Sequence, residues 1–131
     1  MSKLEKISLK SFTDQRGTLS VLELQDYVDW PVKRIYYLTD PRETRGQHAV
    51  RGENKFYICQ KGKMKARFHD GKEWKEFELN GPGDTILMEG LYYREFFDFS
   101  EDAVLLALSS VNYDQKDYIY DLDEFLKEVN N

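Results

Sequence analysis

Turn signals divide this chain into short apolar segments, and that division limits its fold more than any other feature. The clusters KGK, DG and GPGD, at residues 61–63, 70–71 and 81–84, favour tight turns. The segments between such clusters have the length of strands, and we predict about ten strands in all. They include residues 4–9, 18–24, 34–38, 55–60, 64–68, 74–79, 85–88, 91–99 and 103–110.

Side-chain alternation supports these strands, and a single helix follows them. Met64, Ala66 and Phe68 alternate with basic residues, which is the pattern of a half-buried strand. Residues 121–129 carry apolar side chains at helical spacing after an acidic first turn. No room remains for helices between the strands, which excludes a doubly wound α/β fold. The sequence therefore predicts one all-β domain over residues 1–131, a barrel or sandwich with a short C-terminal helix.

Composition indicates a folded domain and argues against several classes of partner. Aromatic residues make up 15% of the chain, which a disordered segment would lack. With a net charge of −5 and no run of Lys or Arg, we expect no nucleic-acid surface and no binding to acidic membranes. The N-terminus has no apolar signal core, so we expect a soluble cytoplasmic protein. The single cysteine, Cys59, is predicted to be a buried apolar side chain.

His48 is the first candidate for chemistry. It is one of two histidines, it lies between Arg45 and Arg51, and an imidazole moves protons at neutral pH. The other histidine, His69, adjoins the Asp-Gly turn, and we predict that it is a solvated turn residue.

Two motifs resemble the two-part signature of the cupin superfamily, which implies a jelly-roll β-barrel. The first is Gly46-x-His48 ahead of a strand that ends at Gly62, and the second is GPGD at residues 81–84 ahead of a strand that reaches Arg94. In metal-binding cupins, histidines and a glutamate from these motifs converge on one ion. Here Val50 and Arg94 stand at two of the histidine positions, while Glu53 or Asn54 stands near the glutamate position. Arginine does not lose its proton to become a ligand, so we predict no metal and no other cofactor.

The remaining interior suits proton abstraction next to a carbonyl. His48 would take the carbon-bound proton, and Arg94 with nearby tyrosines would stabilise the enolate oxygen. Alternation places Tyr92, Arg94 and Phe96 on one face of their strand. An inward Arg94 requires a polar interior, because burying a charge in an apolar core is costly.

Over most of its length the chain also resembles the sugar 3,4-ketoisomerases that act on dTDP-4-oxo-6-deoxyglucose. The matching pieces are Asp14-x-Arg16-Gly17-x-Leu19, Arg34-Ile35-Tyr36-Tyr37, Arg45-Gly46-x-His48-Ala49, the Gly62 turn, Asp98-Phe99-Ser100 and Tyr113-Asp114-x-x-Asp117-Tyr118-Ile119. The resemblance implies a metal-free homodimer, with strands exchanged or paired across its interface. It also implies conversion of the 4-keto sugar to a 3-keto sugar through a cis-enediol(ate). The product would pass to an aminotransferase, in a pathway to 3-amino-3,6-dideoxy sugars of lipopolysaccharide or S-layer glycans.

The resemblance also implies roles for individual residues. His48 matches the base, Arg94 matches a position that varies between histidine and arginine, and Tyr37 and Arg45 would lie beside the sugar and pyrophosphate. The expected catalytic residues are His48, Tyr37 and Arg94, and the expected substrate-binding residues are Arg16, Arg34, Arg45, Arg51 and Tyr92. Members of the family commonly carry His-Ala-His-Lys where this chain reads His48-Ala49-Val50-Arg51, so one imidazole is replaced by an apolar side chain. One base can serve both carbons, because C3 and C4 are adjacent.

Two other functions stay open at this point. A 3,5-epimerase-like cupin would act on the same class of substrate, but that family has a His–Asp pair, and no clear carboxylate partner for His48 is found in the local sequence. A non-catalytic sugar-nucleotide binding module would explain Val50 as the mark of lost chemistry.

Overall fold

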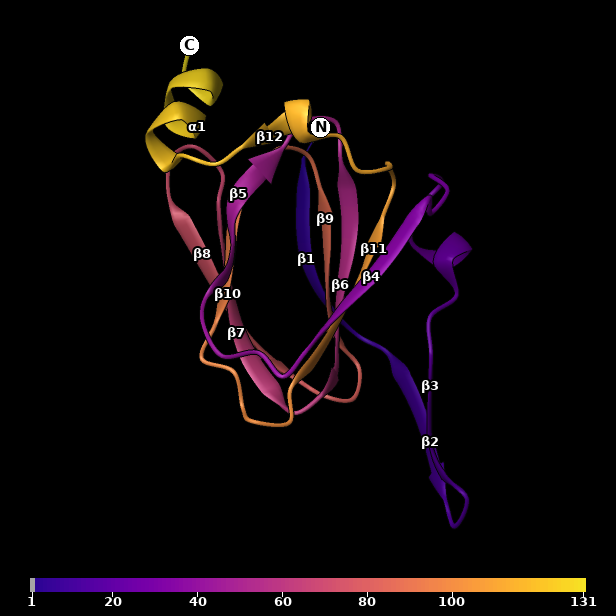
Figure 1. Ribbon diagram of the computed structural model, residues 1–131. Coiled ribbons are helices and arrows are strands. Elements are labelled where there is room, and N and C mark those ends of the chain that lie inside the picture. Colours follow the sequence, from indigo (N-terminus) through magenta and orange to yellow (C-terminus); the bar gives the residue numbers. More distant parts are fainter. Residues whose placement is uncertain (1) are drawn as a thin grey trace.

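Two five-stranded sheets face each other and enclose the interior of the molecule (Figure 1). The computed structural model describes residues 2–131. One sheet has the order β1 (Lys3–Ser8), β9 (Asp84–Glu89), β6 (Asn54–Lys61), β11 (Val104–Ser109) and β4 (Arg34–Thr39). The other has the order β12 (Tyr118–Ile119), β5 (Arg45–Val50), β10 (Tyr93–Phe97), β7 (Lys63–His69) and β8 (Trp74–Asn80).

All the strand pairs in these sheets are antiparallel. Within residues 2–131 no hydrogen-bonded strand pair joins one sheet to the other, so the predicted barrel is an open, two-sheet one. The predictions of an all-β fold and a short C-terminal helix are confirmed. In the same residues, no helix is long and apolar enough to cross a membrane.

A hairpin of β2 (Lys10–Asp14) and β3 (Gly17–Val21) projects away from the two sheets (Figure 1). On one face the hydroxyls of Ser11 and Ser20 pair across the hairpin at 2.8 Å. On the other face Phe12 and Leu19 are cross-strand partners, and they are 61% and 64% exposed. Adjacent large apolar side chains with that exposure are unusual on the surface of a monomeric protein.

β6 shows how the sequence builds both sides of its sheet. Phe56 and Ile58 point outward, where the segment around η1 (Leu24–Asp26) packs against them. Tyr57 and Cys59 point inward, into the core between the sheets. Cys59 is fully buried, as predicted, and burial raises the pKa of its thiol to about 11. Because side chains alternate along a strand, Lys55 belongs to the inward set.

The C-terminal segment covers one end of the second sheet. After η2 (Gln115–Asp117) and β12 comes α1 (Leu122–Val129). Its N-cap is Asp121, whose carboxylate accepts a hydrogen bond from the Asp123 amide at 2.9 Å. Phe125 is fully buried, and its ring centroid lies 6.2 Å from that of His69. The prediction of a solvated His69 is therefore wrong. The helix covers this side chain, whose Nδ1 accepts a hydrogen bond from the Gly71 amide at 2.9 Å.

Candidate active site

A cavity of about 140 Å³ lies between the two sheets, and both sheets contribute to its wall. Its lining from β4, β6 and β11 comprises Tyr36, Tyr37, Leu38, Tyr57 and Leu105. Its lining from β5 and β10 comprises Arg45, Gly46, His48, Arg94 and Phe96. The segment around His48, which the sequence suggested was a loop, is therefore a strand, β5, and it pairs with β10.

A β-bulge sets the position of His48. Arg94 lies opposite His48 and Glu95 opposite Gly46, so Gln47 is the extra residue on β5. Gly46 and Gln47 have φ angles of 93° and 55°, both in the left-handed region. A Cβ atom on Gly46 would lie 2.9 Å from the Arg94 carbonyl oxygen, so glycine allows the two strands to approach.

The hydrogen bond of His48 fixes its tautomer. Its Nδ1 lies 2.8 Å from the Gly46 carbonyl oxygen, which can only accept, so Nδ1 carries the proton and Nε2 has the free lone pair. Burial and the charge of Arg94 lower the pKa of His48 to about 4. The Tyr118 ring stacks nearby, with its centroid 4.9 Å from that of the imidazole. His48 is therefore neutral at neutral pH and is able to accept a proton.

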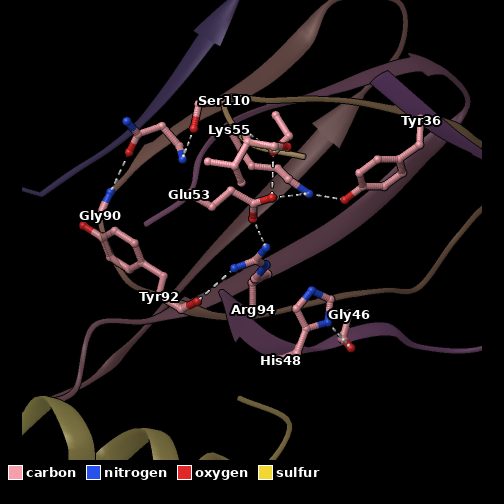
Figure 2. Close-up of polar contacts among 12 residues, drawn as sticks. Tyr36, Gly46, His48, Glu53, Lys55, Gly90, Tyr92, Arg94 and Ser110 are labelled. Atoms are coloured by element: carbon pink, nitrogen blue, oxygen red, sulfur yellow. Dashed lines mark hydrogen bonds and ion pairs between the residues drawn. The ribbon is translucent and has the colours of Figure 1, made fainter. Parts of the chain in front are cut away.

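Arg94 is a fully buried cation held by a buried carboxylate (Figure 2). Its Nη2 donates to Glu53 at 2.6 Å and its Nη1 donates to the Tyr92 carbonyl oxygen at 3.3 Å. The second Glu53 oxygen accepts from the Ser109 hydroxyl at 2.8 Å. Burial alone would raise the pKa of Glu53, but Arg94 and Lys55 outweigh burial and lower it. Glu53 is therefore a carboxylate at neutral pH.

Lys55 is a second buried cation that shares the same carboxylate. Its Nζ lies 3.6 Å from Glu53 Oε2 and donates a hydrogen bond to the Tyr36 hydroxyl (Figure 2). The Tyr36 and Tyr57 ring centroids lie 4.3 Å and 5.0 Å from Nζ. Burial, and then repulsion from Arg94, lower the pKa of Lys55 to about 7. Glu53 cannot neutralise two cations, and lysine can release a proton where arginine cannot.

Four of the eight predicted site residues line the cavity, and a fifth lies beside it. His48 and Arg94 are in its interior, while Arg45 is exposed at its rim. Tyr37 also reaches the rim but is 69% exposed. The guanidinium carbon of Arg34 lies 4.7 Å from the ring centroid of Tyr36.

The other three predicted residues lie outside this cavity within one chain. Arg16 is at the exposed end of the hairpin and pairs with Asp14 at 2.5 Å. Arg51 is paired with Glu128 on α1, through hydrogen bonds of 2.8 Å and 2.7 Å. The Tyr92 ring packs in the core against Phe68, although Arg94 does share its inward face as predicted.

Sequence reasoning missed several side chains of the site. They are Tyr36, Lys55, Tyr57 and Tyr118, while Glu53 was noted only as standing near a metal-ligand position. One signal was present in the strand that contains Lys55. Alternation groups Lys55 with Tyr57 and Cys59, and a lysine on that buried face requires partners.

The chemistry of these side chains does not match a metal site. Among residues 2–131, no group of three His, Cys, Asp or Glu side chains gathers as a metal ion would require. The absence of a metal remains a prediction, which activity in the presence of a chelator would test.

The fold and the cavity together define a class: a small cupin-like jelly-roll protein whose interior cavity holds a neutral imidazole, His48, beside a buried guanidinium, Arg94. Residues 2–130 match the family described as "FdtA: WxcM-like, C-terminal". A TDP-4-oxo-6-deoxy-alpha-D-glucose-3,4-oxoisomerase of Aneurinibacillus thermoaerophilus is 32% identical over 125 residues, which cover 94% of this chain and 90% of that protein. The chain belongs to the FdtA family, and by family it is an isomerase.

Solved structures agree with this assignment. QdtA, a sugar 3,4-ketoisomerase from Thermoanaerobacterium thermosaccharolyticum in complex with TDP, superposes with a TM-score of 0.88 and 35% identity, over 97% of this chain and 94% of that one. A mutant of the same protein was solved in complex with TDP-4-keto-6-deoxyglucose. A 3,4-ketoisomerase from Helicobacter canadensis gives a TM-score of 0.88 and 34% identity, over 98% of each chain.

Proposed function

We propose that this protein is a nucleotide-sugar 3,4-ketoisomerase that converts dTDP-4-oxo-6-deoxyglucose to a dTDP-3-oxo-6-deoxyhexose. The observation that carries the proposal is a neutral imidazole, His48, beside a permanent buried cation, Arg94, in one cavity. Relatives named as isomerases of this class, one of them bound to the keto sugar, support the choice of substrate.

His48 carries the proton between the two carbons. Its Nε2 removes the proton from C3, and the electrons form the C3–C4 double bond of an enediol(ate). The same imidazolium then returns the proton to C4, which leaves a ketone at C3 and a hydroxyl at C4. Negative charge that develops on the substrate stabilises the imidazolium, so a histidine with a lowered pKa can serve as the base.

Arg94 stabilises the oxygen that becomes negative. A preorganised buried cation lowers the energy of such an oxyanion far more than one in water would. Within residues 2–131, Arg94 Nε is buried and has no hydrogen-bond partner, so it remains a free donor for an enediolate oxygen.

The cavity accommodates the sugar, and its rim accommodates the nucleotide. A volume of about 140 Å³ is below the 300–1,000 Å³ that is typical of complete ligand sites. The pyrophosphate would therefore lie at the rim, where Arg34 and Arg45 supply charge, and Tyr37 supplies an aromatic surface.

The functional unit of the proposal is a homodimer. The exposed Phe12–Leu19 pair and an apolar groove on the outer face of the first sheet both need cover. The groove has a volume of about 520 Å³ and includes Leu9, Leu22, Ile58, Leu106 and Leu108 in its wall. A second copy, with its own hairpin, supplies an apolar surface of the same kind. Arg16 can bind substrate only if the hairpin reaches the cavity of the partner subunit. A KM in Arg16→Ala equal to that of the wild type would show that Arg16 is not part of the binding site.

Proton NMR of dTDP-4-oxo-6-deoxyglucose with the purified protein in D2O tests the proposal. We expect loss of the C3 proton signal and the appearance of 3-keto sugar resonances. Exchange at C5 as well would favour a 3,5-epimerase, although the Nδ1 partner of His48 is a carbonyl oxygen and not a carboxylate. Saturable binding without exchange at any carbon would identify a binding module and refute the proposal.

A further inference from the structure

The isomerisation moves two protons, and His48 accounts for one of them. The proton on C3 moves to C4, but the hydroxyl proton on O3 must also leave and another must arrive on O4. A second group that both donates and accepts protons is therefore required near the two oxygens. His48 has its Nδ1 proton committed to the Gly46 carbonyl oxygen, so it is poorly placed for both tasks.

Tyr36 is a cavity residue whose hydroxyl is hydrogen-bonded to a group that can supply a proton, the Lys55 ammonium. The hydroxyl accepts a hydrogen bond from the Lys55 ammonium, and Tyr36 lines the cavity while Lys55 does not. Figure 2 shows Lys55 between Glu53 and Tyr36, on the far side of Glu53 from Arg94. Lys55 is therefore connected to the cavity by its hydrogen bond with Tyr36.

We propose that Lys55 is a positioning residue that supplies and recovers the oxygen-bound proton through the Tyr36 hydroxyl. The inference rests on the proposed isomerase function and assigns a residue to that reaction. It gives the reaction a second proton carrier besides His48.

The steps balance in atoms, electrons and charge. As His48 takes the C3 proton, the C3–H electron pair forms the C3–C4 double bond and the carbonyl π pair moves to O4. O4 takes the Tyr36 proton, and Lys55 replaces it, which leaves a neutral amine and a cis-enediol. In the second half the O3 proton passes to Tyr36, and the Tyr36 proton returns to Lys55. An O3 lone pair then forms the C3 carbonyl, and the π pair takes the proton from His48 at C4.

This sequence moves a positive charge within the site without creating one. Lys55 carries a positive charge before the C3 proton is abstracted. After abstraction Lys55 is neutral and His48 carries the positive charge. The groups that face Lys55 are Glu53, Arg34, Tyr36, Tyr57 and Arg94, with His48 across the cavity. The charge of Lys55 is one of the causes that lower the pKa of His48. Release of the Lys55 proton therefore makes His48 a stronger base during the step in which it takes the C3 proton.

Two variants at Lys55 test the inference. Lys55→Met removes the ammonium at similar volume, and Lys55→Arg keeps a charge that cannot give up its proton. Lys75→Met, on the exposed part of β8, is the matched control. We expect kcat at pH 6 to fall about 100-fold in both Lys55 variants, with KM for the dTDP-sugar and the binding of TDP little changed. The control should keep the wild-type kcat.

The pH profile separates a proton carrier from a structural residue. Wild-type kcat/KM should fall as pH rises through about 7, where the Lys55 ammonium is lost. That limb should be absent from Lys55→Met. A persisting limb, a wild-type rate in Lys55→Met, or full activity in Lys55→Arg would each overturn the inference.

Two further readouts keep the test decisive. If Lys55→Met fails to fold, NMR titration of 15N-lysine in the wild-type protein replaces it, and a Lys55 that titrates at the ordinary value of 10.5 overturns the inference. If the wild-type protein isomerises the sugar and the Lys55 variants do so at the same rate, the role of Lys55 is refuted but the proposed function stands. A wild-type protein that neither exchanges nor isomerises the sugar refutes the proposed function and the inference together.

Discussion

At the scale of single residues, the site is governed by one carboxylate that serves two cations. Glu53 lies 2.6 Å from Arg94 and 3.6 Å from Lys55, and both cations are buried. The positive charge of Arg94 is one cause, after burial, of the lowered pKa values of both Lys55 and His48. His48 is kept neutral by this charge as well as by burial, and its neutrality makes it a base.

Replacement of that base should stop proton exchange and spare ligand binding. We expect His48→Asn, which changes little volume, to lower C3–H exchange in D2O by more than about 100-fold. Calorimetric binding of TDP should stay within about threefold, roughly 0.7 kcal/mol of binding free energy. His69→Asn is the control, because this histidine lies under α1 away from the cavity, and it should retain exchange. Equal exchange rates in wild type and His48→Asn would contradict the assignment.

His48 should also make the stability of the protein depend on pH in a defined window. Its pKa is about 4 in the folded protein and 6.5 in the unfolded chain, so the unfolded chain binds more protons between these values. The free energy of unfolding should therefore fall as pH drops from 6.5 towards 4, by about 2 kcal/mol at pH 4.5 from this residue. Urea unfolding at both pH values checks this, with His48→Asn as reference. The variant should show a smaller loss, and identical losses would show that the histidine is not buried in its neutral form.

At the scale of elements, strand parity and one bulge decide which side chains meet. On β4, Leu38 packs in the core, so Arg34 and Tyr36 share its inward face and Tyr37 faces outward. Tyr37 is 69% exposed and Tyr36 is 36% exposed. The bulge at Gln47 sets where His48 stands opposite Arg94.

Most elements could be predicted because their apolar spacing is a local property. Predicted strands 55–60, 64–68 and 74–79 each fall within an observed strand, and α1 starts one residue after the predicted start. Three strands were not predicted. β2 is polar and exposed, β12 is two residues long, and β5 carries a glycine and charged residues that resemble a loop.

The contacts of the site could not be predicted in the same way. The Glu53–Lys55–Tyr36 group joins the start of β6 to β4, and its geometry depends on pairing through β11 between them. A single sequence carries no signal for that distance. Likewise, His69 is buried by a helix that lies more than fifty residues later in the chain, so its neighbours alone suggested a solvated turn.

The bulge gives a prediction at this scale. Gly46→Ala should destabilise the protein by about 2 kcal/mol or more, because it adds a clash with the Arg94 carbonyl to an unfavourable φ angle. The same change should displace His48 and lower kcat. Gly52→Ala is the matched control, since its φ is 75° but no atom lies within 4 Å of the new methyl group. It should cost only about 1 kcal/mol and leave kcat intact. Equal effects of the two changes would indicate that the close approach has no role.

At the scale of the whole molecule, the projecting hairpin and the apolar groove support a two-subunit particle. Phe12→Ser with Leu19→Ser should convert the proposed dimer to a monomer, measured by sedimentation equilibrium at micromolar concentration. Lys75→Met, on an exposed part of β8 in the other sheet, should leave the dimer intact. A monomeric wild-type protein, or a Phe12→Ser/Leu19→Ser double variant that remains dimeric, would refute the proposed interface.

Cys59 also makes the opening of this two-sheet fold measurable. It is the only thiol in the chain, it is fully buried on β6, and burial raises its pKa to about 11. Only the thiolate reacts with alkylating agents, so the native protein should be labelled only when the core around β6 opens. The labelling rate, followed by mass spectrometry, then measures how often the two sheets separate. A sugar nucleotide held between β4 and β5 would link those sheets, so it should slow the labelling of a cysteine that it never touches.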